Sequence, residues 1–274
     1  MKNNIRVLVI VLGWLLLSNV NSYSQDTSYS QDTSYLSIAP LRIQNMVKPG
    51  KAPIVTLQFS ASYNNGLMDL AASDNNQFNE NDFIGGRNFG TRHGFGLSLT
   101  GKFALHKEGN IRLNVSAYFN QMQSNFLETA SNDGKVSYNV FSGALGIEDN
   151  FTPDRPFKIY VGFDIVPSLI GGNATLRTDS ADFNLKIKNS FRLGLDLNFG
   201  FEYAFTNYFG INFGLKLFHA NLFFKDSKVS TDPAQTYLND AYVNPPIPYS
   251  GWKQFLMGSI YTGINYYFGM KNRK

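Results

Sequence analysis

The sequence predicts a transmembrane β-barrel of eight antiparallel strands, and three observations favour this fold class. Eight segments alternate apolar and polar residues, which places the two kinds of side chain on opposite faces of a strand. The segment Phe191–Tyr203 is longer than the five or six residues common in soluble strands, and it exceeds the roughly nine to eleven that a tilted membrane strand needs. The links between segments alternate between long and short, as the loops and turns of membrane barrels do.

Composition supports an exported all-β protein and excludes several other classes. Charged residues make up only 16% of the chain, and aromatic residues reach 15%. A net charge of +4, scattered along the sequence, does not indicate a nucleic-acid partner. The absence of cysteine excludes disulfides and thiol chemistry. Neither metal-ligand spacing nor a phosphate-binding glycine loop occurs, so we expect no metal and no cofactor.

Four regions are expected along the chain. Residues 1–24 are predicted to be a secretory signal peptide, because two basic residues precede a short apolar run that a polar stretch follows. Residues 25–53 are predicted to be a polar, disordered leader that contains part of the duplicated sequence YSQDTS. Residues 54–268 are predicted to form the barrel, and residues 269–274 a short basic tail.

The first four strands are predicted at Ile54–Tyr63, Gly94–His106, Ile111–Gln121 and Val136–Ile147. In the third, bulky residues share one face because successive strand side chains point to opposite sides. These residues are Ile111, Leu113, Val115, Ala117 and Phe119. The alternation is least regular in the fourth strand.

The last four strands are predicted at Phe157–Val166, Phe191–Tyr203, Phe209–Phe223 and Phe255–Phe268. The strand Phe191–Tyr203 shows the alternation most clearly, with seven bulky apolar or aromatic residues on one face. These residues are Phe191, Leu193, Leu195, Leu197, Phe199, Phe201 and Tyr203.

The links predict the topology. Three are short, namely Lys107–Asn110, Glu148–Pro156 and Ala204–Tyr208. Four are long and rich in polar residues, namely Asn64–His93, Met122–Lys135, Pro167–Asn189 and Phe224–Gln254. Long loops would therefore leave one rim and short turns the other, and an even strand number places both barrel ends at the short-turn rim, in the periplasm.

The polar faces of the strands favour a membrane barrel over a soluble barrel such as a lipocalin, which would also alternate. They carry many glycine, serine and threonine residues, such as Gly96, Ser98 and Gly214. A solvent-facing surface carries more lysine and glutamate, whereas a narrow interior of eight strands has room for small side chains. We therefore predict that the bulky faces point outward to lipid and the polar faces inward.

The predicted lumen also contains charged residues, which we expect to form a network. Its predicted members are Lys102, Arg112, Lys158, Asp164, Arg192, Asp196, Glu202 and Lys216. Charges in a narrow interior need partners, because an isolated buried charge is costly. One hypothesis is a packed, salt-bridged interior that blocks diffusion, and the alternative is a wet pore lined by the same residues.

Tyrosines near the ends of the predicted strands suggest aromatic girdles at the two membrane interfaces. The set comprises Tyr63, Tyr118, Tyr138, Tyr160, Tyr203, Tyr208, Tyr266 and Tyr267.

A lipid-modifying barrel enzyme is a further alternative, for which a histidine on the outer face needs a serine nucleophile beside it. His219 lies near the loop end of its strand, and the residue two positions later, which would share its face, is Asn221. Because the nucleophile is missing, we expect no catalytic residues.

The closing strand GSIYTGINYYF, which ends at the aromatic Phe268, completes a pattern that resembles the eight-stranded outer-membrane β-barrels of the OmpA/OmpX type. The six residues after Phe268 depart from the strictly C-terminal aromatic of that family. The resemblance implies a bacterial outer-membrane location with periplasmic termini. It also implies outer-membrane lipid and the barrel-assembly machinery as partners, together with an unknown extracellular ligand.

The expected function is that of a non-enzymatic outer-membrane barrel that displays four extracellular loops for surface binding or envelope integrity. A small-solute, porin-like channel is the alternative, because fold alone does not determine function.

Overall fold

The computed structural model describes residues 51–71, 88–129, 132–177, 182–228, 230–241 and 253–269. The chain divides into two units, 1–45 and 46–274, and every described residue belongs to the second. The predicted signal peptide, the predicted leader up to residue 50 and the predicted tail after Gly269 lie outside the described residues.

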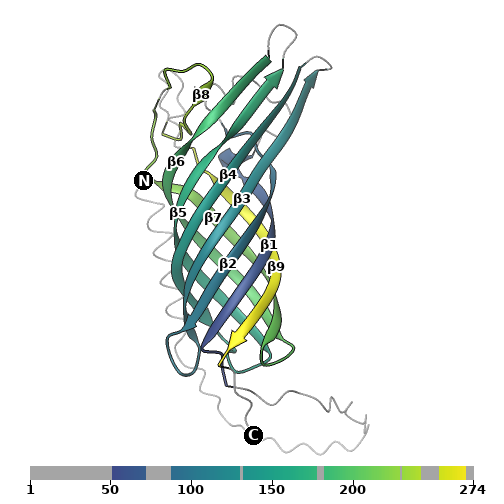
Figure 1. Cartoon of the computed structure of the whole chain (residues 1–274), viewed down its shortest axis with the longest axis vertical. Helices are drawn as coiled ribbons and strands as arrows, with labels where there is room; N and C mark the ends of the chain where they lie inside the picture. The colour runs from purple at the N-terminus through teal and green to yellow at the C-terminus, as the bar shows by residue number, and fades with distance from the viewer. Residues whose placement is uncertain are drawn as a thin grey trace, which may run out of the picture. The chain divides into compact units, whose positions relative to one another are not determined.

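Eight long strands form the barrel, together with one short strand and one 3₁₀ turn (Figure 1). The elements are β1 (Val55–Leu67), η1 (Met68–Leu70), β2 (His93–Ala104), β3 (Ile111–Thr129), β4 (Asn132–Asn150), β5 (Phe157–Arg177), β6 (Asp182–Ala204), β7 (Phe209–Phe223), β8 (Gln235–Thr236) and β9 (Leu256–Phe268). Among the described residues, no helix is long and apolar enough to cross a membrane.

The eight long strands pair in the order β5-β4-β3-β2-β1-β9-β7-β6, and pairing of β5 with β6 closes the ring. Every pair between long strands is antiparallel, and the first and last of them meet in a continuous register from Val55 opposite Phe268 to Leu67 opposite Leu256. Closure leaves no strand edge within the ring, so backbone hydrogen bonds are satisfied all the way round, as a lipid environment requires. The predicted closed barrel of eight antiparallel strands is confirmed.

Two of the four predicted long loops are wrong. The segments Met122–Lys135 and Pro167–Asn189 are mostly strand, because β3 and β4 continue to within two residues of each other and β5 and β6 are joined only by residues 178–181. Figure 1 shows β3 to β6 rising past the other strands as two long hairpins. We call this part of the β3–β6 sheet, residues 121–139 and 170–190, the extension.

The reason for the error is that the direction of the alternation reverses in the extension. On β3 the outward residue Phe119 is followed by outward Gln121 and Gln123, whereas Met122 between them is completely buried. On β4 the same change occurs above Phe141, where Val136 and Tyr138 point inward and are buried. Polar outward residues therefore suggested a loop in the sequence, although they belong to a sheet with an apolar inner face.

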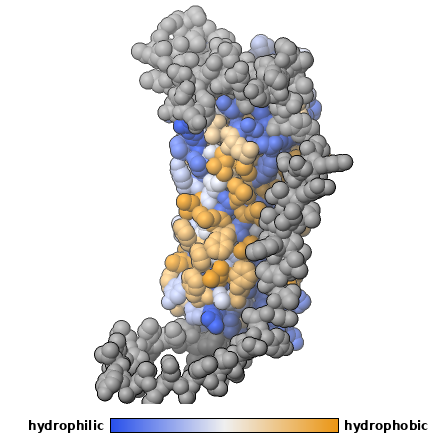
Figure 2. Space-filling model, turned by 180° about the vertical axis from the view of Figure 1, so that it is seen from behind, coloured by the Kyte–Doolittle hydropathy of each residue, from blue (hydrophilic) through white to orange (hydrophobic). Residues whose placement is uncertain are grey.

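Below the extension the outer surface is apolar, as the alternation predicted. Large hydrophobic side chains such as Phe59, Phe141, Leu145 and Ile264 are at least half exposed. Figure 2 shows apolar side chains gathered on the barrel between polar zones. On β3 the apolar outward residues run from Ile111 to Phe119, a length that matches the roughly nine to eleven residues of a membrane-crossing strand.

The predicted tyrosine girdles are only partly correct. Tyr63, Tyr203 and Tyr208 are exposed on the outside. Four others of the set point into the barrel and are buried, namely Tyr118, Tyr138, Tyr160 and Tyr267. Glycines make room for two interior rings: a Cβ on Gly214 would overlap the ring of Tyr261, whose hydroxyl lies 2.8 Å from that of Tyr160.

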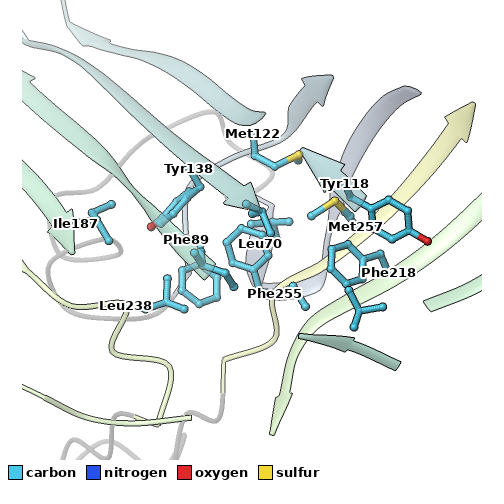
Figure 3. Packing of buried hydrophobic residues seen from close by; sticks show 14 of the residues in the cluster. Leu70, Phe89, Tyr118, Met122, Tyr138, Ile187, Phe218, Leu238, Phe255 and Met257 are labelled. Atoms are coloured by element: carbon cyan, nitrogen blue, oxygen red, sulfur yellow. The ribbon is translucent and has the colours of Figure 1, made fainter. Parts of the chain in front are cut away.

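A hydrophobic core fills the lumen on the side of the long loops (Figure 3). Strand residues such as Met122, Tyr138 and Phe218 line it, and loop residues enter from above. The loop residues are Leu70 and Phe89 from the β1–β2 link and Leu238 and Phe255 from the β7–β9 link. The ring of Phe89 packs against those of Tyr138, at 5.8 Å, and Phe255, at 5.2 Å. We call this cluster the apolar plug.

Candidate functional site

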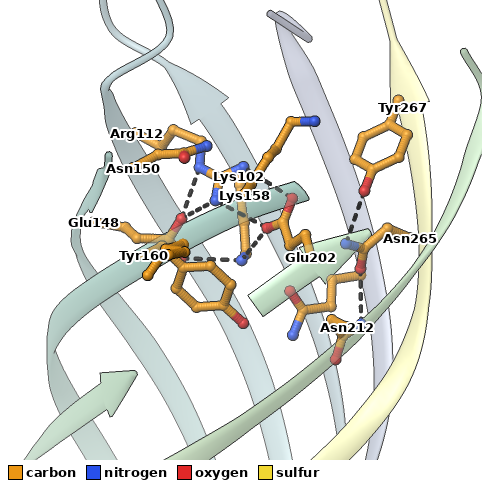
Figure 4. A network of polar contacts seen from close by, with 12 residues as sticks. Lys102, Arg112, Glu148, Asn150, Lys158, Tyr160, Glu202, Asn212, Asn265 and Tyr267 are labelled. Atoms are coloured by element: carbon orange, nitrogen blue, oxygen red, sulfur yellow. Dashed lines mark hydrogen bonds and ion pairs between the residues drawn. The ribbon is translucent and has the colours of Figure 1, made fainter. Parts of the chain in front are cut away.

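The lumen is the candidate functional site, and its lower part contains four buried charges in one cluster (Figure 4). Lys102 on β2 lies 2.9 Å from a carboxylate oxygen of Glu148 on β4 and 2.8 Å from one of Glu202 on β6. The Arg112 guanidinium on β3 bonds to both carboxylates, with an Nη2 to Glu202 Oε1 distance of 2.8 Å. We call these four residues the ionic cluster, in which two cations balance two anions without solvent exposure.

Further polar side chains surround the ionic cluster. The Lys102 ammonium lies 3.8 Å from the centre of the Tyr160 ring, a favourable cation–π contact. Lys158 is buried near the short-turn rim, and its ammonium donates to the backbone oxygen of Arg155 at 2.7 Å. Asn265 donates to the hydroxyl of Tyr267 at 3.2 Å and accepts from Asn212 at 2.8 Å. The lower lumen is therefore packed with side chains that bond to one another.

A second group of charges lies between the ionic cluster and the apolar plug. The Lys216 ammonium lies 2.9 Å from Asp196 Oδ2 and 3.6 Å from the centre of the Tyr118 ring. Asp164 accepts hydrogen bonds from Tyr118, at 3.4 Å, and from Asn198, at 3.1 Å. Register places Asp164 directly opposite Asp196, so the single Lys216 ammonium serves a pair of neighbouring carboxylates.

A cavity of about 40 Å³ lies between these layers. Its lining includes Lys102 and Glu148 from below and Tyr118, Lys216 and Phe218 from above. A single water needs about 10–15 Å³, so the cavity has room for a few water molecules.

The third group of charges ties the β7–β9 link to the barrel wall. The Arg192 guanidinium on β6 makes two hydrogen bonds of 2.8 Å to the Asp240 carboxylate, and a third of 3.1 Å to Asp226. Asn221 on β7 donates to the same Asp240 at 2.9 Å, and its oxygen accepts from the Phe255 backbone at 2.7 Å. A bidentate arginine–carboxylate pair has a defined geometry, so these contacts fix Asp226 and Asp240 of the link against the barrel wall.

Two lysines of the β7–β9 link lie beside this group, of which Lys253 is buried and Lys225 half-buried. The Lys253 ammonium lies 4.7 Å from the centre of the Phe89 ring. Burial lowers the pKa of Lys253 to about 8, against the opposing effect of Asp240 and Asp69. Burial also lowers the pKa of Lys225, whose ammonium donates to the backbone oxygen of Lys253 at 2.8 Å. Removal of these ammonium groups from water therefore costs free energy when the link packs against the barrel as it does here.

The structure places all eight charges of the expected network inside the barrel, in the three groups described above and at Lys158. Three acidic partners of these cations were not in the predicted network, namely Glu148, Asp226 and Asp240. Glu148 could have been predicted to face the lumen, because every second residue of β4 points inward and this alternation reaches Glu148 one residue after the predicted end of the strand. Asp226 and Asp240 lie in an irregular link, where no periodicity indicates which side chains meet. Phe268 points outward, partly exposed, and its ring lies 4.7 Å from that of Tyr266.

His219 and Asn221 do not share a face, so that prediction is wrong. The β6–β7 register shifts between Leu193 and Leu195, which lie opposite Phe223 and His219 respectively. The extra residues on β7 turn Asn221 into the interior, where it is completely buried and hydrogen-bonded as described. Within the described ranges, no group of three or more histidine, cysteine or acidic residues is arranged to hold a metal ion.

Comparison with known proteins adds similarities of shape at low sequence identity. No family model and no curated protein sequence matches the chain. The chain is similar to Neisserial surface protein A, with 14% identity, a TM-score of 0.41, and coverage of 79% of this chain and 99% of the other. It is also similar to Ail, the attachment invasion locus protein of Yersinia pestis, with 12% identity, a TM-score of 0.37, and coverage of 80% and 99%.

A third similarity is to the N-terminal beta-barrel domain of Pseudomonas aeruginosa OprF, with 11% identity, a TM-score of 0.27, and coverage of 79% and 98%. The strand pairing itself establishes the architecture. The chain is a closed, eight-stranded, up-and-down antiparallel β-barrel, and the resemblance to eight-stranded outer-membrane barrels is confirmed for the fold.

Proposed function

We propose that the protein is a non-enzymatic barrel of the bacterial outer membrane that presents a rigid extracellular surface and does not conduct solutes. The observation that carries this proposal is the packed lumen: the ionic cluster and the polar side chains around it occupy the half near the short turns, and the apolar plug occupies the other half. The cavity of about 40 Å³ between them has room for only a few water molecules. The packed interior is thus favoured over the wet pore.

The outer surface supports the membrane location. A contiguous apolar surface around a closed barrel is costly in water and favourable in lipid. The polar outer face of the extension requires water, and it lies at the long-loop rim. We therefore place the extension and both irregular links outside the cell, and the three short turns in the periplasm with both ends of the barrel.

The displayed surface differs from the four long loops that the sequence suggested. Two of the four displayed elements are hairpins of paired backbone, and the other two links contribute side chains to the plug. Such a surface is preorganised, which reduces the entropy lost when a ligand binds. Surface binding or envelope integrity remains the proposed role, and the ligand would meet ordered strands.

Single-channel recording in planar bilayers tests the packed lumen. We expect the purified, folded protein to give no steady openings, because two layers of packed side chains among the described residues occupy the lumen. Large, steady conductance at moderate voltage would contradict the proposal and favour the channel.

Labelling of intact cells tests the orientation. The chain has no cysteine, so a single introduced cysteine is a unique target for a membrane-impermeant maleimide. Thr175→Cys, outward on the extension, should react in intact cells, whereas Glu108→Cys, exposed in a short turn, should react only after permeabilisation. The reverse pattern would show that the barrel is inserted the other way.

A deletion strain separates the two proposed roles. If envelope integrity is the role, the strain becomes sensitive to detergent and recovers with any folded variant. If surface binding is the role, adherence depends on outward side chains such as Gln123 and Lys135, which can be changed without disturbing the plug.

A further inference from the structure

We propose that the outer surface at the junction of β6, β7 and β8 binds a phosphorylated, acylated lipid of the outer leaflet. The phosphate would lie against Lys188 and Lys228, and an acyl chain against Phe191 and Phe224. The inference rests on the proposed membrane location and adds a specific lipid site to it.

The first observation concerns unpaired cations. Inside the barrel, the cations of the three charge groups all have a carboxylate partner. In contrast, Lys186 and Lys188 lie on the outer face of β6 and make no ion pair with any residue that the structure describes. Lys228 is about two-thirds exposed, and its nearest carboxylate, Asp226, lies 3.9 Å away and is bonded to Arg192. The positive charge of this surface is therefore available to an external anion.

The second observation is that two of these cations lie near the same aromatic ring. The ammonium of Lys188 lies 5.1 Å, and that of Lys228 6.0 Å, from the centre of the Tyr237 ring. Tyr237 is held nearby because β8 pairs in parallel with Lys186 and Ile187 of β6. Two ammonium groups around a single ring form a local positive site that suits a phosphate monoester with its double charge.

The third observation is the depth of this site. Phe191 is the outward aromatic residue three positions below Lys188 on β6, and its ring lies 6.0 Å from that of Phe224. Three residues of a strand tilted by about 40° rise roughly 8 Å. The headgroup region on each side of the hydrocarbon core is about 5–8 Å thick. The lysines thus lie at phosphate depth when the Phe191–Phe224 pair lies at the top of the acyl chains.

Phe224 supports the acyl contact independently. It is a non-glycine residue with a φ of +64°, and its side chain is 62% exposed. A bulky residue in the left-handed region is strained, and this conformation accompanies an aromatic ring that is exposed on the outer surface beside Phe191. Charge complementarity and continuity with the apolar outer surface together favour a lipid over a soluble anion.

The test uses the full chain, folded in detergent and mixed with diphosphoryl lipid A or with the same lipid after enzymatic removal of its phosphates. Native mass spectrometry counts the lipids retained. Each lysine near a lipid phosphate contributes about fivefold in affinity, so we expect roughly 25-fold preference for the phosphorylated form from two. Lys188→Gln with Lys228→Gln should abolish this preference, and Phe224→Ala should weaken retention of both lipids.

The matched control is Lys51→Gln with Lys107→Gln, which removes two exposed cations at the short-turn rim and should leave the preference intact. Heat-modifiable migration checks that each variant folds. Equal retention of both lipids by the wild-type protein, or equal loss in the control, would overturn the proposal. Displacement of the lipid by millimolar inorganic phosphate, or tighter binding of soluble polyphosphate, would also overturn it, because the site would then recognise a free anion. If the lipid site is absent, the protein should still fractionate with the outer membrane and give no steady openings in bilayers. The proposed function would then hold although the lipid site is refuted.

Discussion

The ionic cluster leads to a quantitative prediction for the substitution Glu202→Gln. The Glu202 carboxylate is completely buried and accepts hydrogen bonds from Lys102, at 2.8 Å, and from Arg112, at 2.8 and 3.3 Å. The substitution leaves both cations with Glu148 as their single counter-charge, and it places an amide donor beside groups that can only donate. Removal of one partner from a buried ion pair typically costs about 3–5 kcal/mol, so we expect a decrease of that size in the free energy of unfolding.

The measurement is a urea titration of the folded protein in phospholipid vesicles. On unheated SDS gels the folded barrel and the unfolded chain migrate as separate bands, and the intensity of the folded band gives the folded fraction. Glu108→Gln, the same substitution at an exposed position in a short turn, is the control and should change stability by less than about 0.5 kcal/mol. Addition of Lys102→Met to Glu202→Gln restores a neutral cluster and should recover about 1–3 kcal/mol through the coupling of the two sites. A Glu202→Gln variant as stable as the wild type would refute the assignment of these charges to a desolvated network.

Three further predictions concern the apolar plug, the β7–β9 link and the packing of Tyr261. Phe255→Ala removes a completely buried ring from the plug, so the free energy of unfolding should fall by about 3–5 kcal/mol in the same titration, and unaltered stability would argue against a packed plug. Lys253 has a folded pKa of about 8, below its ordinary 10.5, so the folded state loses its proton first as pH rises. The closed link should therefore gain up to about 1.4 kcal/mol per pH unit between pH 8 and 10.5, and hydrogen exchange of its amides, corrected for intrinsic rates, should show this in the wild type and not in Lys253→Met. Gly214→Ala should displace the Tyr261 ring and destabilise the barrel by about 1–3 kcal/mol, whereas Gly143→Ala, where a Cβ meets nothing within 4 Å, should be neutral.

The strands that face lipid could be predicted from the sequence because a single physical rule governs them. Each such strand needs an apolar outer face, and its inner face must be small or paired, so two-residue periodicity and residue size are sufficient. Phe191–Tyr203 follows this rule without exception, and the inward positions of Lys102 and Glu202 follow from it directly.

The extension was missed because the same period has the opposite meaning there. Met122, Val136 and Ile170 are apolar residues that face inward, so the alternation shifts by one residue where the outer surface changes from apolar to polar. If apolar residues are expected only at outward positions, the point where they move to inward positions looks like the end of the strand. Asp240 could not be predicted as the partner of Arg192, because it reaches the wall through an irregular link whose course depends on tertiary contacts.

The change of phase in the extension also determines where this protein can vary during evolution. Inward residues such as Val136 and Ile187 are fixed by packing, whereas their sequence neighbours Lys135 and Lys186 are exposed and belong to a surface under different constraints. Replacement of an outward polar side chain by another costs little stability, since surface substitutions usually change it by less than about 0.5 kcal/mol. Sequence divergence driven by external binders should therefore accumulate at the outward residues of the two hairpins. In related chains, variable outward positions should alternate with conserved inward positions.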